Sequence, residues 1–167
     1  MSDIEVGTQL EAMIGLATTC AARALELYRE HQDTGIGVRM KSPGDPVTAA
    51  DTELDTLICR RLKDLYPHAS VIGEESVPAG DQLVEALAAR HVFFVDPIDG
   101  TREFVSGTGE FAIMIGLAVD GRAAAGVVAV PTEGVVFAGE VGQQALLVRG
   151  GTRQRLELSS IEEFSAA

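Results

Sequence analysis

The sequence predicts an α+β fold in which two long helices pack on a largely antiparallel sheet. The N-terminal half contains two segments with helical spacing of apolar residues, and the C-terminal half contains runs of β-forming residues separated by tight turns. Helices that precede a meander of strands are typical of the α+β class. With 167 residues, 46% of them hydrophobic, the chain can bury a core, and we expect residues 1–167 to form a single domain.

The first predicted helix occupies the N-terminal segment and ends near His31, because Gly35 and Gly37 follow closely. Its apolar residues recur at intervals of three and four: Leu10, Met13, Ile14, Ala17, Ala21, Ala24, Leu25 and Tyr28. Residues 38–46 contain two prolines and a glycine, so we expect an exposed loop or a loose hairpin there.

The second predicted helix begins at Thr48, which with Asp51 has the spacing of a capping box, and ends at Tyr66-Pro67. Its apolar face consists of Leu54, Leu57, Ile58, Leu62 and Leu65. Three shorter elements are expected next: a strand at residues 70–73, a helix at 81–90 and a strand at 91–95.

From Phe111 onward the pattern changes to that of a sheet. The expected strands are residues 111–119, 122–130, 135–139 and 145–148. A tight hairpin turn at Asp120-Gly121 separates the first two, and Gly150-Gly151 turns the chain again. The continuous apolar runs indicate that at least one face of this sheet is covered, and the two long helices are the available cover.

The charge of the chain limits its partners. With 25 acidic and 13 basic residues the formal charge is −12, which argues against binding to nucleic acid or to an anionic membrane. Cys20 and Cys59 lie in helical patterns and form no metal-binding pair, which indicates reduced thiols. The sequence contains no signal peptide and no membrane-spanning apolar run, so we expect a cytoplasmic protein.

Three groups of acidic residues lie where the chain leaves regular structure. Asp51 is in the first turn of a helix, the pair Glu74-Glu75 follows a strand, and Asp96 and Asp99 follow another. Carboxylates are ligands that suit Mg²⁺, with Mn²⁺ as the alternative. A bound cation would offset the negative charge of the chain and allow an anionic substrate, and such ions promote phosphoryl transfer.

Each acidic group also has an ordinary structural explanation. Asp51 could be a helix-start acid, which the helix dipole favours. Glu74 and Glu75 could be a solvated pair, and Asp-Pro-Ile-Asp-Gly-Thr could be only a turn. Taken singly, the acids therefore leave a purely structural alternative open.

Taken together and in order, the segments TAAD (48–51), IGEES (72–76) and DPIDGT (96–101) resemble the inositol monophosphatase family of Mg²⁺-dependent, lithium-sensitive phosphatases. The likeness extends over nearly the whole chain, including YPHASVIGEES, FFVDPIDGTREF and GVVAVP. The resemblance implies the N-terminal lobe of that fold. It also implies hydrolysis of a small phosphorylated metabolite by metal-activated water, without a covalent phosphoenzyme.

The resemblance also implies roles for individual residues. The implied metal ligands are Glu74, Asp96, Asp99 and the backbone carbonyl of Ile98. The implied catalytic residues, which lie near the attacking water, are Asp51, Glu74 and Thr101. The implied substrate-binding residues are Asp99, Gly100 and Thr101, and the implied outer residues of the site are Glu75 and Lys41. Backbone amides at a turn attract anions, which agrees with the role of Gly100 and Thr101.

Two further segments bear on the substrate. Arg102-Glu103-Phe104 after the motif and Gly109-Glu110-Phe111 resemble the 3′(2′),5′-bisphosphate nucleotidase branch of the family. This branch implies removal of the 3′-phosphate from 3′-phosphoadenosine 5′-phosphate to give AMP. Inositol-1-phosphate, or a related sugar or histidinol phosphate, is the alternative substrate.

The length of the chain departs from the family pattern. Members usually continue into a second α/β lobe with a W-D-x-A-like motif, whereas this sequence contains no tryptophan. We therefore expect a chain without that lobe, which associates with a second lobe or forms a homodimer through an uncovered apolar face. The alternative of another class is a catalytically incomplete metal-binding fragment that pairs with another chain.

Overall fold

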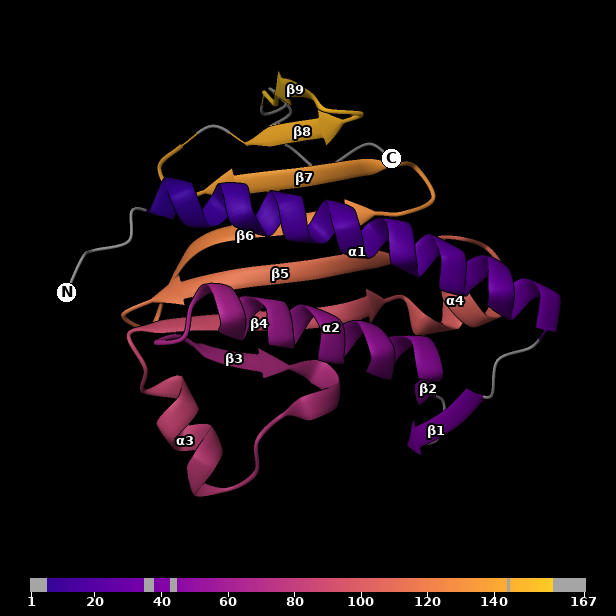
Figure 1. The fold of residues 1–167 in the computed structure, drawn as a ribbon, viewed down its shortest axis with the longest axis horizontal. Helices are drawn as coiled ribbons and strands as arrows, with labels where there is room; N and C mark the ends of the chain where they lie inside the picture. Colours follow the sequence, from indigo (N-terminus) through magenta and orange to yellow (C-terminus); the bar gives the residue numbers. More distant parts are fainter. Residues whose placement is uncertain (1–5, 35–37, 43–44, 144, 158–167) are drawn as a thin grey trace, which may run out of the picture.

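A computed structural model describes residues 6–34, 38–42, 45–143 and 145–157. It confirms the predicted fold class, because two long helices cover one face of a mostly antiparallel sheet of seven strands (Figure 1). Helix α1 (Val6–Thr34) lies over strands β5 to β7, and helix α2 (Ala49–Leu65) lies over β3 and β4. None of the described helices is both long and apolar enough to cross a membrane.

The strands follow one another across the sheet in chain order. The seven are β3 (Ser70–Gly73), β4 (His91–Asp99), β5 (Ala112–Val119), β6 (Arg122–Val130), β7 (Val135–Glu140), β8 (Leu146–Arg149) and β9 (Thr152–Arg155). Only the pair β3–β4 is parallel among them. Strands β1 (Val38–Ser42) and β2 (Asp45–Thr48) form a separate antiparallel hairpin, which confirms the hairpin expected around residues 38–46.

Three short helices complete the fold: η1 (Glu74–Ser76), α3 (Asp81–Leu87) and α4 (Thr101–Ser106). Helix α2 begins as predicted with a capping box, in which the Thr48 backbone N–H donates to Asp51 Oδ2 at 2.8 Å. The Thr48 side chain in turn accepts from the backbone N–H of Asp51 at 3.4 Å. The box anchors the start of α2 beside the hairpin that precedes it.

Three predicted ends differ from the structure by three or four residues. Helix α1 continues past His31 to Thr34, because nothing between these residues breaks a helix. Helix α3 ends at Leu87 rather than at residue 90. Strand β4 does not end at Val95 but continues through Asp99, with an irregular register against β5 between Asp96 and Asp99. Pro97 lies inside this irregularity, and a proline, which has no N–H to donate, is tolerated there.

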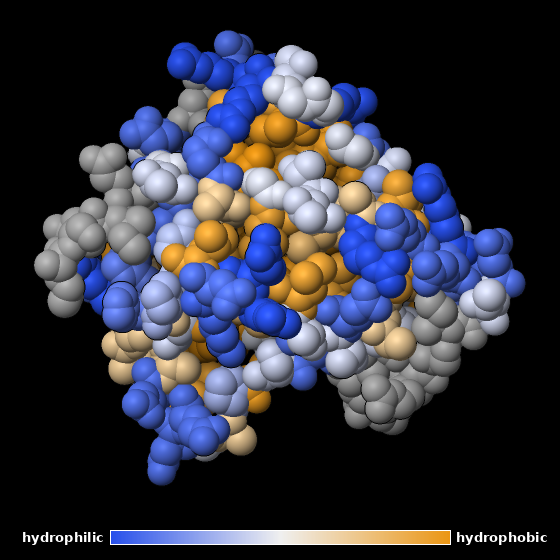
Figure 2. All heavy atoms as spheres, viewed as in Figure 1, coloured by the Kyte–Doolittle hydropathy of each residue, from blue (hydrophilic) through white to orange (hydrophobic). Residues whose placement is uncertain are grey.

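The core lies between the helices and the sheet. Its most buried large side chains include Met13, Leu54, Phe93, Ile113, Ile115 and Leu117. Figure 2 shows the helix-covered face, where hydrophobic residues are visible around α1 and over β7 and β8. A hollow of about 260 Å³ beside α1 is lined by Ala21, Leu25, Val136 and Val148. The helix layer therefore leaves part of the sheet near β8 open.

The opposite face of the sheet has a different character. Phe94 and Phe137 are 41% and 39% exposed. Gly116, Gly126 and Gly139 pair with one another across β5, β6 and β7, and Phe94 pairs with Gly116. The row of glycines makes this face smooth, and no described helix packs over it as α1 and α2 pack over the other face.

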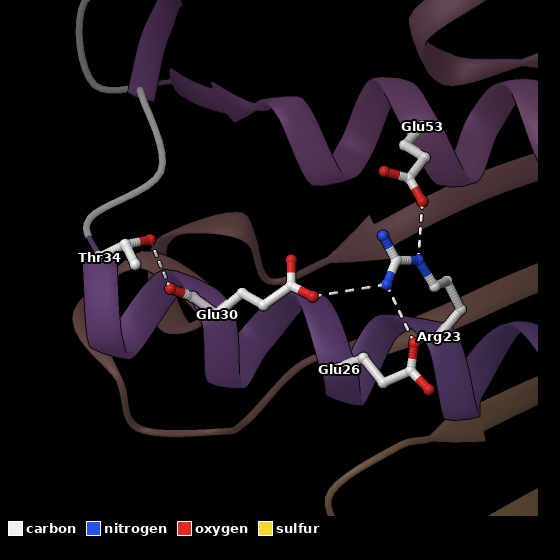
Figure 3. A network of polar contacts seen from close by, with 5 residues as sticks. All are labelled: Arg23, Glu26, Glu30, Thr34 and Glu53. Atoms are coloured by element: carbon white, nitrogen blue, oxygen red, sulfur yellow. Dashed lines mark hydrogen bonds and ion pairs between the residues drawn. The ribbon is translucent and has the colours of Figure 1, made fainter.

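A polar network on the surface joins the two long helices (Figure 3). Arg23 of α1 contacts Glu53 of α2 at 2.8 Å and Glu26 of its own helix at 3.0 Å. Glu30 lies 3.6 Å from the same guanidinium and accepts a hydrogen bond from Thr34 through its backbone carbonyl. All of these side chains are at least one third exposed, so each pair adds little stability, although together they orient α1 against α2.

Candidate active site

One side of the candidate site is built on the start of α2. Asp51 is 2% exposed, and both of its carboxylate oxygens accept hydrogen bonds. Oδ2 accepts from the backbone N–H and the hydroxyl of Thr48. Oδ1 lies 3.0 Å from the hydroxyl of Thr101, which is also 3.1 Å from the carbonyl oxygen of Ile98. Through these hydrogen bonds, Asp51 joins the start of α2 to the beginning of α4.

The other side of the site is formed by the ends of two neighbouring strands. Because β3 and β4 are parallel and Gly73 pairs with Val95, the two strands place Glu74 and Asp96 next to each other. Burial raises the pKa of Asp96 to about 7, assisted by the charge of Glu74, a hydrogen bond with Glu74 and the charge of Asp99. Asp96 Oδ1 is buried and has no hydrogen-bond partner among the described residues. On this side of the site, Asp96 thus has an oxygen that no hydrogen bond from the described residues satisfies.

The turn between β4 and α4 depends on a glycine. Gly100 has a φ of +91°, and a Cβ there would lie 2.8 Å from the carbonyl oxygen of Glu110. Only glycine fits both the backbone conformation and the close approach of the segment before β5. The turn reverses the chain so that Thr101 begins α4 directly beside Ile98 and Asp51.

The structure gathers most of the predicted site residues around one cavity. This cavity of about 240 Å³ is lined by Glu74, Asp96, Ile98, Asp99, Gly100, Thr101, Arg102 and Glu103. The metal ligands and substrate-binding residues that the sequence predicted are all among them. Their specific roles stay predictions.

The donor set in this cavity fits a divalent cation in part. Within the described residues, no group of three or more acidic, histidine or cysteine side chains is already arranged as a metal site. The cavity nevertheless offers oxygen donors of the kind that Mg²⁺ and Mn²⁺ prefer. Asp96 Oδ1 accepts no hydrogen bond from the described residues, so it is available to a cation. A cation would also offset the charges of Glu74 and Asp99 that help to raise the pKa of Asp96.

Three predicted residues lie outside this cavity. Asp51 is behind Thr101 and does not line it. Glu75 lies in η1, but its carboxylate is not part of the lining either. Lys41 is on strand β1, and its side chain is outside the part of the chain that the structure describes.

Asp55 is a residue of this region that the sequence prediction missed. It lies one turn after Asp51 on α2 and is 2% exposed, and its Oδ1 accepts from the backbone N–H of Glu75 at 3.4 Å. A signal for it was available, because an acid between Leu54 and Ile58 falls on the apolar face of an amphipathic helix. Such a buried acid needs a specific partner.

A larger hollow of about 740 Å³ adjoins the site through Asp99 and Gly100. Glu103, Glu110 and Glu133 are among its lining residues, so its wall is strongly acidic. Tyr28 and Phe111 also line this hollow, and the rings of Phe104 and Phe111 are 5.0 Å apart, each packed against Tyr28. Both phenylalanines are almost completely buried, so they act as core residues.

The sequence of the chain is similar to members of one protein family. The sequence profile of the inositol monophosphatase family matches residues 9–166. Inositol monophosphatase 1 of Bos taurus is 34% identical over 150 residues, which are 89% of this chain and 52% of the relative.

Two solved structures extend the comparison to the fold. Mycobacterium tuberculosis SuhB has a TM-score of 0.77 and 29% identity, over 99% of this chain and 57% of that one. A staphylococcal IMPase-II has a TM-score of 0.62 and 29% identity, over 80% of this chain and 44% of that one. This chain spans about half the length of the curated relatives it matches. Because the family profile covers nearly all of its residues, the chain belongs to the inositol monophosphatase family.

Proposed function

We propose that this chain supplies the metal-binding and phosphate-binding side of a phosphatase that hydrolyses a small phosphorylated metabolite. The observation that carries the proposal is the cavity at the ends of β3 and β4, where Asp96 presents a buried oxygen that no described residue hydrogen bonds. In a family of phosphatases, such a cavity is the natural place for a cation and a phosphate.

The residues of the chain would divide the work in this way. Glu74, Asp96, Asp99 and the Ile98 carbonyl would hold Mg²⁺, or Mn²⁺ in its place. When bound, the metal would supply Lewis-acid activation of water and stabilisation of the leaving oxygen. Asp51 orients the Thr101 hydroxyl, which would help to position the attacking water. The Gly100 turn would present backbone amides to the phosphate.

Inositol-1-phosphate is the substrate that we favour. The matched relatives are named inositol monophosphatases, and the staphylococcal IMPase-II has been solved with inositol monophosphate bound. The acidic wall formed by Glu103, Glu110 and Glu133 suits a substrate with one phosphate and several hydroxyl groups. Carboxylates accept hydrogen bonds from hydroxyls but repel a second phosphate.

3′-Phosphoadenosine 5′-phosphate is the second candidate. The sequence segments at residues 102–104 and 109–111 favour it, and the staphylococcal IMPase-II has also been solved with 2′AMP bound. Against it, Phe104 is fully buried, and Phe111, although it lines the larger hollow, is only 3% exposed. This weakens the part of the sequence signal that those two phenylalanines carry.

The smooth face of the sheet supports a proposal about assembly. Phe94 and Phe137 expose apolar surface there, and this chain spans about half the length of its relatives. We expect a second lobe to cover this face, with a homodimer as the alternative. Such a lobe would also close the candidate site, because Asp96 and Phe94 lie on the same strand and line one shared hollow.

The deciding experiment measures phosphate release from inositol-1-phosphate and from 3′-phosphoadenosine 5′-phosphate, each with and without Mg²⁺. We expect Mg²⁺-dependent release that falls steeply in Glu74→Gln and Asp99→Asn, and inhibition by lithium. Glu53→Gln, which changes an exposed acid of α2, is the matched control. Mg²⁺ binding without release would favour the incomplete fragment, and neither binding nor release would favour the purely structural explanation of the acids.

A further inference from the structure

We propose that Asp55 is a positioning residue that holds the turn Gly73–Ser76 and, through it, the Glu74 carboxylate at the candidate site. The inference deepens the proposed function and rests on it for the role of Glu74. Asp55 itself does not line the metal cavity. Asp55 acts on the position of Glu74 indirectly, through its hydrogen bond with the backbone of Glu75.

The first observation is the burial and bonding of Asp55. The residue is 2% exposed on the core-facing side of α2, a position that acids rarely occupy without a partner. Its Oδ1 accepts from the backbone N–H of Glu75 at 3.4 Å. The bond therefore joins α2 to the residue that directly follows Glu74.

The second observation is the contact with Gly73. A Cβ at Gly73 would lie 2.0 Å from Asp55 Oδ1 and 2.7 Å from its Cγ. Gly73 has φ −94° and ψ 150°, which any residue can adopt, so the backbone conformation does not require glycine. The carboxylate of Asp55 is what excludes a side chain there. Glycine and aspartate form one close-packed unit at the end of β3.

A third observation concerns Cys59, which lies near the same unit. Burial raises the pKa of the Cys59 thiol, one helical turn after Asp55, to about 11, and the neighbouring Asp55 and Ser76 also influence this pKa. Asp55 therefore contacts Gly73 and Glu75, whereas Glu74, between these two residues, is exposed and lines the cavity.

Helix α2 thus supports both halves of the site from successive turns. Asp51 bonds to Thr101 at the start of α4, and Asp55 bonds to Glu75 in η1. The spacing of four residues places both carboxylates on the same side of the helix. The distance between the two loops that carry the site residues is therefore set by one rigid helix.

The test compares Asp55→Ala, Asp55→Asn and the control Asp64→Ala, which removes an exposed acid from the same helix. The first measurement is amide hydrogen exchange of Glu75 in the metal-free chain. We expect exchange to accelerate about tenfold in Asp55→Ala, because the amide loses its acceptor. Asparagine keeps an acceptor oxygen, so Asp55→Asn should stay within about threefold of the original chain, as should the control.

The second measurement is Mn²⁺ affinity, taken well below the unfolding temperature so that stability alone does not affect it. We expect binding about tenfold weaker in Asp55→Ala, and similarly weaker in Gly73→Ala, whose new Cβ would displace the carboxylate. Because both substitutions disrupt one unit, their effects in the double variant should be far from additive. Gly73→Ala also serves as the test if Asp55→Ala does not fold.

Unchanged exchange of the Glu75 amide in Asp55→Ala would overturn the positioning role, and so would an undisturbed turn in Gly73→Ala. Equal Mn²⁺ affinity in folded Asp55→Ala and in the original chain would reduce Asp55 to a purely structural residue. If the original chain binds no Mn²⁺, the proposed function fails. The exchange measurements then still decide whether Asp55 holds the turn.

Discussion

The two sides of the candidate site use buried carboxylates in opposite ways. On the helix side, both oxygens of Asp51 accept hydrogen bonds from Thr48 and Thr101. On the strand side, Asp96 Oδ1 has no hydrogen-bond partner in the part of the chain that the structure describes, and burial together with Glu74 and Asp99 raises the pKa of Asp96 to about 7. The first arrangement stabilises the fold without any ligand. The second is unfavourable until a proton or a cation arrives.

This difference suggests a division of labour within one small region. A site that binds a cation needs oxygen atoms that accept no hydrogen bond from the protein. Such atoms destabilise the metal-free fold, so other interactions have to stabilise it. The capping box of α2 and the hydrogen bond between Thr101 and Asp51 lie next to the site and supply such stabilising interactions. Four predictions, in order of decreasing effect, test whether the two sides differ in this way.

The largest effect is expected for Asp51→Ala. The change removes the Asp51 side of the capping box, so the Thr48 N–H loses its acceptor and the Thr101 hydroxyl keeps only the Ile98 carbonyl. The free energy of unfolding should therefore fall by about 3 kcal/mol. Urea denaturation of the metal-free chain measures it. Glu53→Ala, an exposed acid on the same helix, is the control and should lose much less. Equal losses in the two variants would remove the structural role assigned to Asp51.

The second effect concerns metal binding on the strand side. Mg²⁺ at 100 times its Kd should stabilise the chain by about 2.7 kcal/mol, because it binds only the folded state. Asp96→Asn should abolish this gain, since it removes the charge of a predicted ligand. Thermal unfolding with and without Mg²⁺ measures the difference. A full Mg²⁺ response in Asp96→Asn would place the cation elsewhere.

The sequence predicted the helix side of this comparison well because its signals are local. Apolar residues at spacings of three and four predicted the two helices, and Thr48 with Asp51 predicted the cap, since all of these interactions lie within one or two turns. The hairpin turn at Asp120-Gly121 is equally local, and Asp120 indeed has a positive φ of 50°. The family motifs also predicted most of the residues that line the cavity.

The parts that the sequence did not predict depend on contacts between distant segments. Pro97 suggested a turn, but pairing with β5 keeps β4 extended through Asp99. The role of Asp55 needs β3 to lie against α2, which no local pattern contains. The segments that end in Phe104 and Phe111 predicted a nucleotide substrate, whereas both rings pack on Tyr28 and are almost completely buried. Tertiary packing decided each of these cases.

The third effect concerns the hydrogen bonds of the Thr101 hydroxyl. Thr101→Val keeps the shape of the side chain but leaves Asp51 Oδ1 without a donor, so we expect a loss of about 1.5 kcal/mol in unfolding free energy. Thr101→Ser keeps the hydroxyl and should lose less than half of that amount. Urea denaturation measures the unfolding free energy of both variants. If valine were tolerated as well as serine, the bond between α2 and α4 would contribute nothing to stability.

The smallest effect has the opposite sign and concerns Asp96 without metal. Asp96→Asn removes a carboxylate whose ionised form the fold disfavours, so the metal-free variant should gain about 1 kcal/mol at pH 8, allowing for solvent screening of a half-buried group. Because the folded-state pKa of Asp96 is raised to about 7, the original chain loses this stability as the pH rises from about 4 to 7. The advantage of the variant should therefore be near zero at pH 4 and complete above pH 7. Urea denaturation across this range measures it, with Asp64→Asn as the exposed control. A loss of stability in Asp96→Asn at pH 8 would show that Asp96, like Asp51, stabilises the fold, and the contrast between the two sides would disappear.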